Sequence, residues 1–286
     1  MRKINTLSVV VAVLVVTSLM VSGAFAVSSE GHHAPVANTE DVVRRANHMA
    51  LYQGDTCKGK VHLKITDSQG RTRLRDLNIL RKDLGESDGK QLYMSYFRAP
   101  ADVRKMVFLV HKTVESGKDD SRWLYMPSLD MVKRIAAGDK RTSFAGSDFL
   151  YEDISGRGLN EDHHELLSND NGQYVIRNTP KNTQEVEFAY YDAYINRDNY
   201  IPVKMKYYKK SGELYRTMEV LEIKAITAEK DGETLSYPTV VTSKVTNLET
   251  GSETVMSFSD VQYNVSVKDS VFGERYLRRP PRVLMR

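Results

Sequence analysis

The sequence predicts a mainly β protein, an antiparallel sheet that follows one amphipathic helix and is interrupted by an apolar loop. Three observations predict this class. From residue 58 onward, apolar and polar residues alternate over many short segments, which is the period of half-buried strands. Short turns rich in Gly, Asn and Asp separate these segments, and such turns join antiparallel neighbours. Residues 39–50 instead carry apolar side chains at helical spacing.

The first 26 residues have the pattern of a secretory signal peptide. A positively charged start precedes an apolar run over residues 7–21, and an A-x-A site ends at Ala26. We expect cleavage after Ala26, which delivers the mature protein to the periplasm. The alternative, an uncleaved anchor helix, needs about 20 apolar residues, which is longer than this run. Residues 27–38 are expected to form a disordered leader.

Charge and cysteine content exclude several classes of protein. The formal net charge is +4, and removing Arg2 and Lys3 with the signal peptide leaves +2. This is too mild for nucleic-acid binding, whose proteins are commonly strongly basic. The single cysteine, Cys57, rules out an internal disulfide framework. With 41% hydrophobic residues and no visible linker, residues 39–286 are expected to form one domain stabilised by burial.

The helix is expected to begin at Thr39, whose hydroxyl can cap it. Glu40 and Asp41 occupy the first turn, where the helix dipole favours negative charge. Gly54 marks the expected end of the helix. The helix has one broad apolar stripe that must lie against the following strands, made of Val42, Val43, Ala46, Met49 and Ala50.

Roughly ten to twelve strands are expected in a meander, joined by short hairpin turns. After a first hairpin over residues 58–79, the predicted strands span 91–97, 106–112, 122–126, 163–167, 174–178, 186–195, 203–208, 214–227, 239–247 and 254–263. A short closing element is expected over residues 269–279. A long meander has two edges to protect, so it closes, splits into two layers or curls around other elements.

The second strand of the first hairpin carries three arginines on one face, Arg71, Arg73 and Arg75. Leu77 and Ile79 share their parity, so we expect a bulge or an exchange of the buried face near residue 76. A row of arginines is most often a solvated sheet face. The functional alternative is a docking strip for lipid phosphates or an acidic partner.

Residues 121–157 hold the most unusual segment of the chain. A strand with Trp123 has apolar side chains on both faces, which predicts cover on both sides, and Pro127 ends it. The loop that follows contains a second apolar group, made of Phe144, Phe149, Leu150, Tyr151 and Ile154 around Gly146. Loops normally run over the outside of a protein. This loop is expected to be either a plug that closes a core or a flap beside an apolar cavity.

No motif in the chain indicates catalysis, a metal or a cofactor. The segment Ala145–Asp148 lacks the second glycine of a hydrolase elbow, and Cys57 has no sequence signature of a nucleophile. In the acidic and histidine-rich run at 161–165, only Glu161, His163 and Glu165 share a strand face, and a solvated strand start explains them. A periplasmic hydrolase would need a histidine close to a serine or carboxylate, and the sequence shows no such pairing.

Several short blocks in order resemble the LolA-like family of outer-membrane lipoprotein-sorting proteins. The resemblance spans residues 39–279, and no single block would suffice. Where the family often has a glycine after the P-A-D-V-x turn, this chain has Lys105. The blocks are EDVVRRANHMALY, KVHLKITDSQGRTRLRDLNILRK, FRAPADVRK, WLYMPSLDMVKRI, FAGSDFLYEDI and SVFGERYLRR.

The resemblance implies a half-open β-barrel whose helix and loop cover a hydrophobic cavity. It implies a non-enzymatic periplasmic carrier that binds a lipid or lipoprotein acyl chain and moves it towards the outer membrane, with an outer-membrane acceptor and an RND-type inner-membrane exporter as partners. Triacylated lipoprotein, phospholipid and hopanoid all fit as cargo. The residues expected to line or gate the cavity are Met94, Tyr96, Phe108, Val110, Trp123, Tyr125, Arg134, Phe144, Phe149 and Tyr151, with Arg134 facing a headgroup.

The alternative hypothesis is an accessory subunit of an envelope complex whose barrel is filled with its own side chains. The 16 tyrosines suit both hypotheses, because aromatic strands fill barrels and also line cavities whose hydroxyl groups meet a headgroup. Whether the interior of the barrel is hollow or solid decides between the two hypotheses.

Overall fold

The computed structural model describes residues 38–85, 88–113 and 118–285. The chain divides into two units, Met1–Val36 and Ala37–Arg286, and the fold below belongs to the second. The predicted signal peptide and all of the predicted leader except Asn38 lie outside the described residues. The domain limits at residues 26 and 38 therefore stay predictions.

Thirteen strands form one antiparallel sheet within the described ranges, in the order β6-β5-β4-β3-β2-β1-β13-β12-β11-β10-β9-β8-β7. Most neighbours in the sheet are also neighbours in sequence, as hairpin turns require. Their bounds are β1 Thr56–Thr66, β2 Thr72–Leu84, β3 Lys90–Ala99, β4 Val107–Lys112, β5 Ser121–Met126, β6 Met131–Ile135, β7 Asp162–Ser168, β8 Gln173–Pro180, β9 Tyr190–Asn196, β10 Pro202–Tyr208, β11 Leu214–Lys230, β12 Glu233–Asn247 and β13 Ser252–Tyr263.

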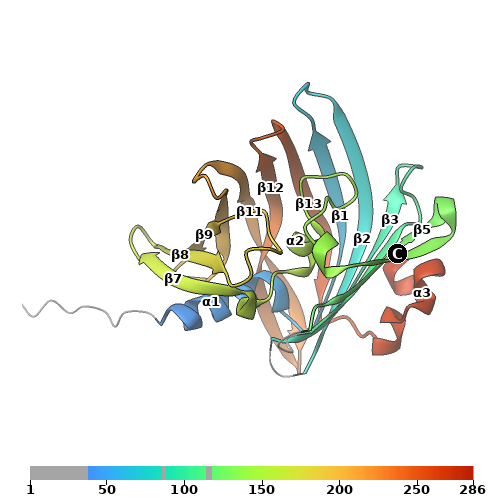
Figure 1. Cartoon of the computed structure of the whole chain (residues 1–286). Helices are drawn as coiled ribbons and strands as arrows, with labels where there is room; N and C mark the ends of the chain where they lie inside the picture. The colour runs from blue at the N-terminus through green and yellow to red at the C-terminus, as the bar shows by residue number, and fades with distance from the viewer. Residues whose placement is uncertain (1–37, 86–87, 114–117, 286) are drawn as a thin grey trace, which may run out of the picture. The chain divides into compact units, whose positions relative to one another are not determined.

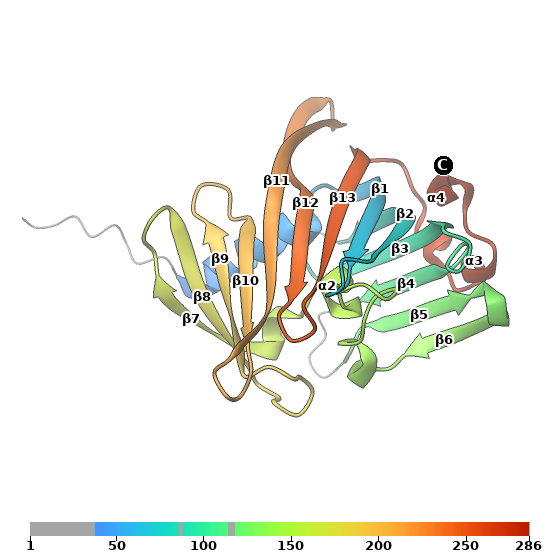
Figure 2. The same cartoon turned by 90° about the horizontal axis from the view of Figure 1, so that it is seen from above.

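The sheet is open, with β6 at one edge and β7 at the other. Figure 2 shows the strands fanning from β7 to β6, and Figure 1 shows the sheet curling around α2 (Tyr151–Ser155). The expected mainly β, incompletely closed barrel is confirmed. The sequence did not predict β6, a short edge strand whose apolar pattern is interrupted by Lys133 and Arg134.

The N-terminal helix α1 (Thr39–Asn47) continues as a π-helical turn, η1 (His48–Tyr52). Its cap differs from the expectation: the Asn38 side chain, one residue earlier, accepts the backbone N–H of Glu40 at 3.0 Å. Asn is among the best capping residues. As predicted, the apolar stripe lies on the strands, where Val42, Val43 and Ala46 pack against residues of β8 and β9.

The two faces of the sheet are packed by different segments. We call the face that carries Val61, Leu77 and Phe108 the inner face, and the face that carries Leu80 and Met94 the outer face. On the outer face, three short helices of the C-terminal segment cover β2 to β5 (Figures 1 and 2). They are η5 (Asp269–Phe272), α3 (Arg275–Arg278) and α4 (Arg282–Met285).

Strand β5 is covered on both sides, as its sequence predicts. Trp123 and Tyr125 pack on the outer face with the C-terminal helices, whereas Leu124 and Met126 pack on the inner face. The predicted irregularity in β2 is confirmed as a bulge, since its register with β3 shifts between Asp76 and Leu77.

In the turn before β4, Lys105 stands where the family often has a glycine. Lys105 adopts a φ of 69°, in the left-handed region that glycine occupies without a steric penalty. The glycine that the family often carries at this position therefore matches the local backbone. In this chain the same conformation is held by a lysine, whose N–H donates to the Phe97 carbonyl at 2.8 Å.

Short single turns complete the list of helical elements. They are η2 (Pro127–Leu129), η3 (Ala137–Asp139) and η4 (Leu159–Glu161). The first forms the tip of the β5–β6 hairpin. We call the apolar loop of residues 136–156 the lid; η3 lies at its start, and η4 follows its end.

Candidate functional site

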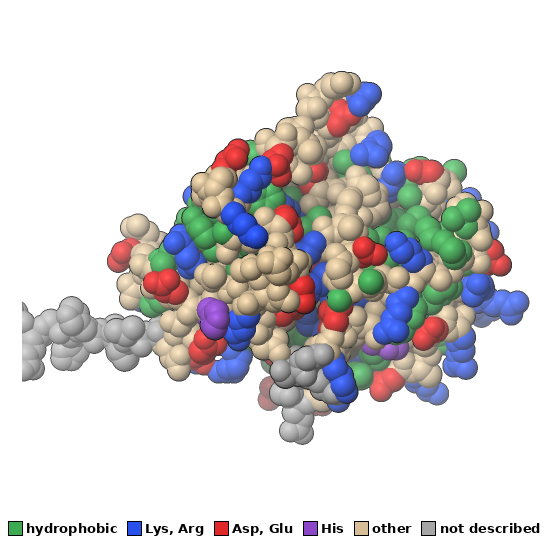
Figure 3. Space-filling view, in the orientation of Figure 1, with side chains coloured by type: hydrophobic (Ala, Val, Ile, Leu, Met, Phe, Trp, Pro, Cys, Tyr) green, Lys and Arg blue, Asp and Glu red, His purple; other side chains and the backbone are tan. Residues whose placement is uncertain are grey.

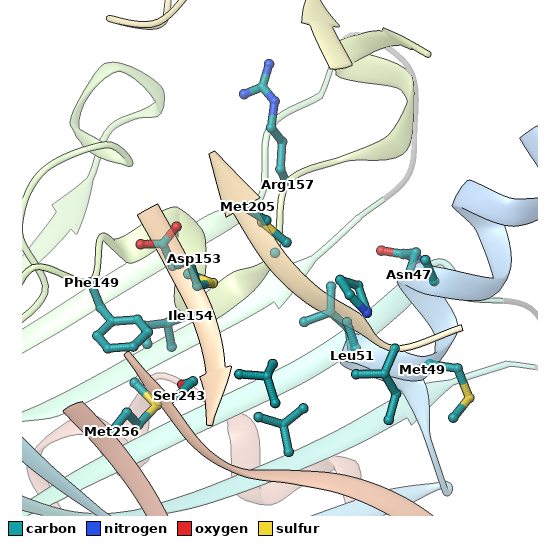
Figure 4. A pocket seen from close by; sticks show the side chains of 18 of the residues that line it. Asn47, Met49, Leu51, Phe149, Asp153, Ile154, Arg157, Met205, Ser243 and Met256 are labelled. Carbon is teal, nitrogen blue, oxygen red and sulfur yellow. The ribbon is translucent and has the colours of Figure 1, made fainter. Parts of the chain in front are cut away.

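The inner face holds an apolar cavity of about 390 Å³. It lies between the strands, the helical segment α1–η1 and the lid. Figure 4 shows side chains from all three, among them Met205, Leu51 and Ile154, arranged around it. The volume falls within the range of about 300 to 1,000 Å³ that is usual for small-molecule sites.

The alternation of side chains along each strand determines which residues line the cavity. On each strand every second residue points inward, so a continuous apolar wall forms across the sheet. Methionines are prominent in it, and their flexible thioethers adapt to ligands of varied shape. The apolar strand residues of the wall include Val61, Leu77, Ile79, Ile176, Ala193, Ile195, Met205, Met218, Val220, Met256 and Phe258.

The lid supplies the opposite wall and also fills part of the inner face. Phe149 and Ile154 line the cavity. Phe144 lies with its ring centroid 5.6 Å from that of Phe108 and 5.5 Å from that of Phe97. The inner face is therefore filled around Phe97 and Phe108, whereas the cavity is lined by residues of β1 to β3 and β8 to β13.

Backbone carbonyl groups of the lid are held by the arginine row of β2. Arg73 donates to the Gly146 carbonyl at 3.2 Å, and Arg75 donates to the Ala145 carbonyl at 3.4 Å. Arg75 is buried, which corrects the expectation of a fully solvated row. These two arginines dock the protein's own lid, and Arg71 pairs with Asp67 at 2.7 Å.

Glu152 of α2 is the centre of a buried charge cluster. Its carboxylate oxygens lie 2.5 Å from Arg141 Nη1, 3.1 Å from Arg157 Nη1 and 3.5 Å from Lys140 Nζ. Burial by itself raises the pKa of this carboxyl, but the three cations outweigh it and lower the pKa of Glu152 to about 2. The lid is therefore anchored by an ionised carboxylate that is only 3% exposed.

Further anchors tie the C-terminal part of the lid to the sheet. Asp153 forms a buried ion pair with Arg216 of β11. At the C-terminal end, Lys112 of β4 donates to the carbonyl groups of Ser155 and Gly156 at 2.9 and 2.7 Å. Because these contacts are charged and buried, the lid is a fixed part of the domain.

The lid meets the helical segment through a purely apolar contact. A Cβ atom added to Gly156 would lie 2.2 Å from Leu51 Cδ1 of η1, so the leucine side chain rests directly on the glycine backbone. Leu51 also lines the cavity. The boundary between η1 and the lid is thus formed at this point by an apolar contact.

A few polar groups interrupt the apolar lining. Arg81 donates to the carbonyl groups of Leu51 and Gln53, which fixes the end of η1. The Tyr191 hydroxyl donates to Asp162 at 3.0 Å. The Tyr93 hydroxyl has no hydrogen-bond partner among the described residues, and burial raises the pKa of Tyr93 well above its usual value.

The ten residues predicted for the cavity fall into three groups. Phe144 and Phe149 line it. Phe108, Val110 and Tyr151 lie behind them, in the solid part of the inner face. The other five lie away from the cavity: Met94, Tyr96, Trp123 and Tyr125 pack on the outer face, and Arg134 is exposed on β6. Ligand contact by any of the ten stays a prediction.

Sequence reasoning missed most of the true lining. On β3 the residues that face the cavity are Gln91 and Tyr93, one position out of phase with Met94 and Tyr96. The tyrosine-rich strands were a partial signal, since Tyr191 and Tyr207 line the cavity. Tyr190, Tyr194 and Tyr208 lie on the other side of the sheet and stack with each other or with cations.

The described residues offer neither a metal site nor a membrane-spanning helix. No group of three or more His, Cys, Asp or Glu side chains is placed to hold a metal ion within the part of the chain that the structure describes. None of the helices in that part is long and apolar enough to span a bilayer. Cys57 is buried, and burial raises the pKa of its thiol.

Comparisons with solved structures identify the fold. A DUF1329 family protein from Desulfovibrio piger is similar at 25% identity with a TM-score of 0.71, covering 84% of this chain and 98% of that one. An outer membrane lipoprotein-sorting protein domain from Vibrio parahaemolyticus is similar at 23% identity with a TM-score of 0.71, covering 85% and 100%. A LolA superfamily protein from Nitrosomonas europaea is similar at 20% identity with a TM-score of 0.62, covering 84% and 100%.

Sequence comparisons give one family match. A search of curated proteins finds no match. A family model described as "-like: Uncharacterized protein" matches residues 89–279, which is more than half of the chain. The chain belongs to the family that this model describes, and its fold is that of the DUF1329 and LolA superfamily proteins.

Proposed function

We propose that this protein is a periplasmic carrier that binds a lipid or lipoprotein acyl chain in the inner-face cavity and moves it towards the outer membrane. The single observation that carries the proposal is the apolar hollow of about 390 Å³ between the sheet and the lid. The similarity to a lipoprotein-sorting domain supports it. No chemical step is part of this role.

The physical basis is the cost of exposing a hydrocarbon chain to water. Each buried CH₂ group is worth about 0.8 kcal/mol, so a carrier gains affinity with every methylene it encloses. Met205, Met218 and Met256 give the wall a deformable surface that accommodates chains of different length and branching. A carrier that handles related lipids requires this tolerance.

Entry requires part of the wall to move, and the anchors indicate which part. The lid is tied to the sheet through Asp153, which pairs with Arg216 of β11, and through the Lys112 contacts. Among the described residues, the lid meets η1 through the apolar contact of Leu51 on Gly156. We therefore infer that an acyl chain enters where η1 separates from the lid, with the lid staying in place.

The proposed partners follow from the same role. A periplasmic carrier receives its cargo at the inner membrane, for which an RND-type exporter is our candidate, and delivers it to an outer-membrane acceptor. Phe144 and Phe149 are the predicted residues that would touch the chain directly. Phe108, Val110 and Tyr151 would support them from behind.

The proposal is tested by filling the cavity. Ala193 lines it and is buried on β9, so Ala193→Phe places a ring where the ligand would lie. Displacing two methylenes would weaken binding of a fluorescent acyl probe by roughly tenfold. The matched control is Val175→Phe, which adds a ring on the neighbouring strand β8 outside the cavity lining. Equal binding by both variants would refute the proposal.

A second candidate is an accessory subunit of an envelope complex. The observation that favours it is the solid part of the inner face, where Phe97, Phe108 and Phe144 pack against each other. Under this alternative the remaining hollow has no ligand. The acyl probe would then bind neither the unmodified protein nor the two variants.

A further inference from the structure

An exposed apolar tip lies at the β6 edge of the sheet. Leu129 and Met131, at the turn of the β5–β6 hairpin, are 66% and 42% exposed. Leu129 is the most exposed large hydrophobic side chain among the described residues. Figure 3 shows hydrophobic side chains gathered at this end of the molecule, with Lys and Arg side chains beside them.

Cations surround this tip. Lys133 and Arg134 follow it on β6, and both are exposed. Arg278 of α3 lies against the hairpin, because its Nε donates to Asp130 at 3.1 Å and its guanidinium lies 5.7 Å from the centroid of the Tyr125 ring. Arg275, one turn earlier on α3, is also exposed. We call these residues, together with Leu129 and Met131, the tip surface.

Acidic side chains near the tip surface offset only part of this charge. Asp130 pairs with Arg278, and Asp139 lies 3.7 Å from Lys133 Nζ. Glu274 precedes α3, and Arg279 and Arg282 follow within the same segment, both exposed. The hairpin tip and the C-terminal helices therefore present a net positive charge around two protruding apolar side chains.

We propose that the tip surface docks the protein on an anionic phospholipid bilayer. Leu129 and Met131 enter the boundary between headgroups and acyl chains, and the surrounding Lys and Arg side chains contact lipid phosphates. Small apolar protrusions rimmed by cations bind membrane surfaces in this way. Each cation near an anionic membrane strengthens binding by roughly fivefold.

Two other occupants fit the surface less well. A second copy of the chain would pair along β6, but Lys133 and Arg134 on this edge strand oppose edge-to-edge pairing. A stable protein partner usually buries about 800 Å² on each side over a broad and complementary patch. Two side chains at the tip of a hairpin offer a narrow protrusion instead.

The proposal is independent of the cavity, and it adds a step that carriage alone does not require. A protein docked at this edge lies close to the lipid that it loads or releases. The sole tryptophan, Trp123, is on β5 of the same hairpin and pairs with Arg134 of β6. Its fluorescence therefore follows changes around this hairpin when the protein binds a bilayer.

The test uses the full mature chain and vesicles of phosphatidylethanolamine with phosphatidylglycerol, with phosphatidylcholine vesicles for comparison. We expect binding and a blue shift of Trp123 emission on the anionic vesicles, with binding weakened by added salt. Leu129→Ser with Met131→Ser should weaken binding at least about tenfold. Lys133→Glu with Arg134→Glu should abolish the preference for anionic lipid.

Matched controls come from elsewhere on the surface. Leu221→Ser with Ile223→Ser removes two exposed apolar side chains from β11, and Lys64→Glu with Lys210→Glu removes two exposed cations. Neither control should change vesicle binding. The cavity variant Ala193→Phe should bind vesicles as the unmodified protein does, which separates this proposal from the carrier role.

Three results would overturn the inference. They are absence of binding to the anionic vesicles, equal binding to both kinds of vesicle, and loss of binding in the control variants to the same extent as in the tip variants. Self-association that the tip variants abolish, without vesicle binding, would assign the surface to a second copy of the chain.

Discussion

Two half-buried tyrosines of the cavity differ in how their hydroxyl groups are satisfied. Tyr191 donates to Asp162, a carboxylate that also accepts hydrogen bonds from Arg157. Tyr93 lines the same cavity with no partner for its hydroxyl among the described residues. Buried polar groups that lack a partner cost stability, whereas hydrogen bonds to charged groups add to it. The two residues therefore allow a matched comparison.

Removing each hydroxyl should have different consequences. Tyr191→Phe removes one of the two side chains that donate to the Asp162 carboxylate and should lower the free energy of unfolding by about 1.5 to 3 kcal/mol. Tyr93→Phe removes an unpaired group and should change it by less than about 0.5 kcal/mol. Urea unfolding followed by circular dichroism measures both. A loss in Tyr93→Phe as large as in Tyr191→Phe would contradict this assignment.

The alternation of side chains on β3 explains why the predicted lining residues of this strand lie one position out of phase with the observed ones. Alternation shows that Met94 and Tyr96 share one face of β3 and that Tyr93 lies on the other. Both faces of this strand are apolar, because the C-terminal helices cover the outer face and the lid covers the inner one. The sequence pattern therefore defines two faces without indicating which of them borders the hollow.

At the scale of elements, the lid is stabilised by charge as much as by burial. Its aromatic side chains were visible in the sequence as an unusual apolar loop. Its anchors were not, because Glu152 is paired with Arg141 and Arg157 from within the lid and just beyond it, and Asp153 with Arg216 from β11. Pairs at such irregular sequence separations leave no periodic pattern.

The charge of Glu152 predicts how the stability of the lid depends on pH. An unfolded Glu titrates near pH 4.3, and the pKa of Glu152 in the folded protein is about 2. The stabilisation is therefore complete above about pH 4.3 and is lost as the pH falls towards 2. A shift of this size corresponds to about 3 kcal/mol.

The variant Glu152→Gln tests this dependence. It leaves three buried cations without their shared carboxylate and should destabilise the protein at neutral pH by roughly 3 to 5 kcal/mol. Its free energy of unfolding should then fall less steeply than that of the unmodified protein between about pH 4.3 and pH 2. The control Glu213→Gln changes an exposed carboxylate and should match the unmodified protein. Parallel pH profiles for Glu152→Gln and the unmodified protein would contradict the role of this charge.

At the scale of the whole molecule, the fold was predictable and the hollow was not. Period-two segments separated by turns define an antiparallel meander, and one helix with a single apolar stripe must cover part of it. Whether the curled sheet is solid depends on how far the lid reaches across it. Phe144 and Tyr151 fill the region over Phe108, and the lid leaves the region towards Met205 and Met218 open.

Native mass spectrometry of the protein purified from the periplasm is the most direct test of the central claim, that the inner face encloses space for a hydrocarbon chain. We expect a bound lipid that dissociates from the protein on gentle collisional activation. This lipid should be depleted in Ala193→Phe but retained in Val175→Phe. A ligand-free mass for the unmodified protein, together with failure to take up an added fatty acyl chain, would contradict it.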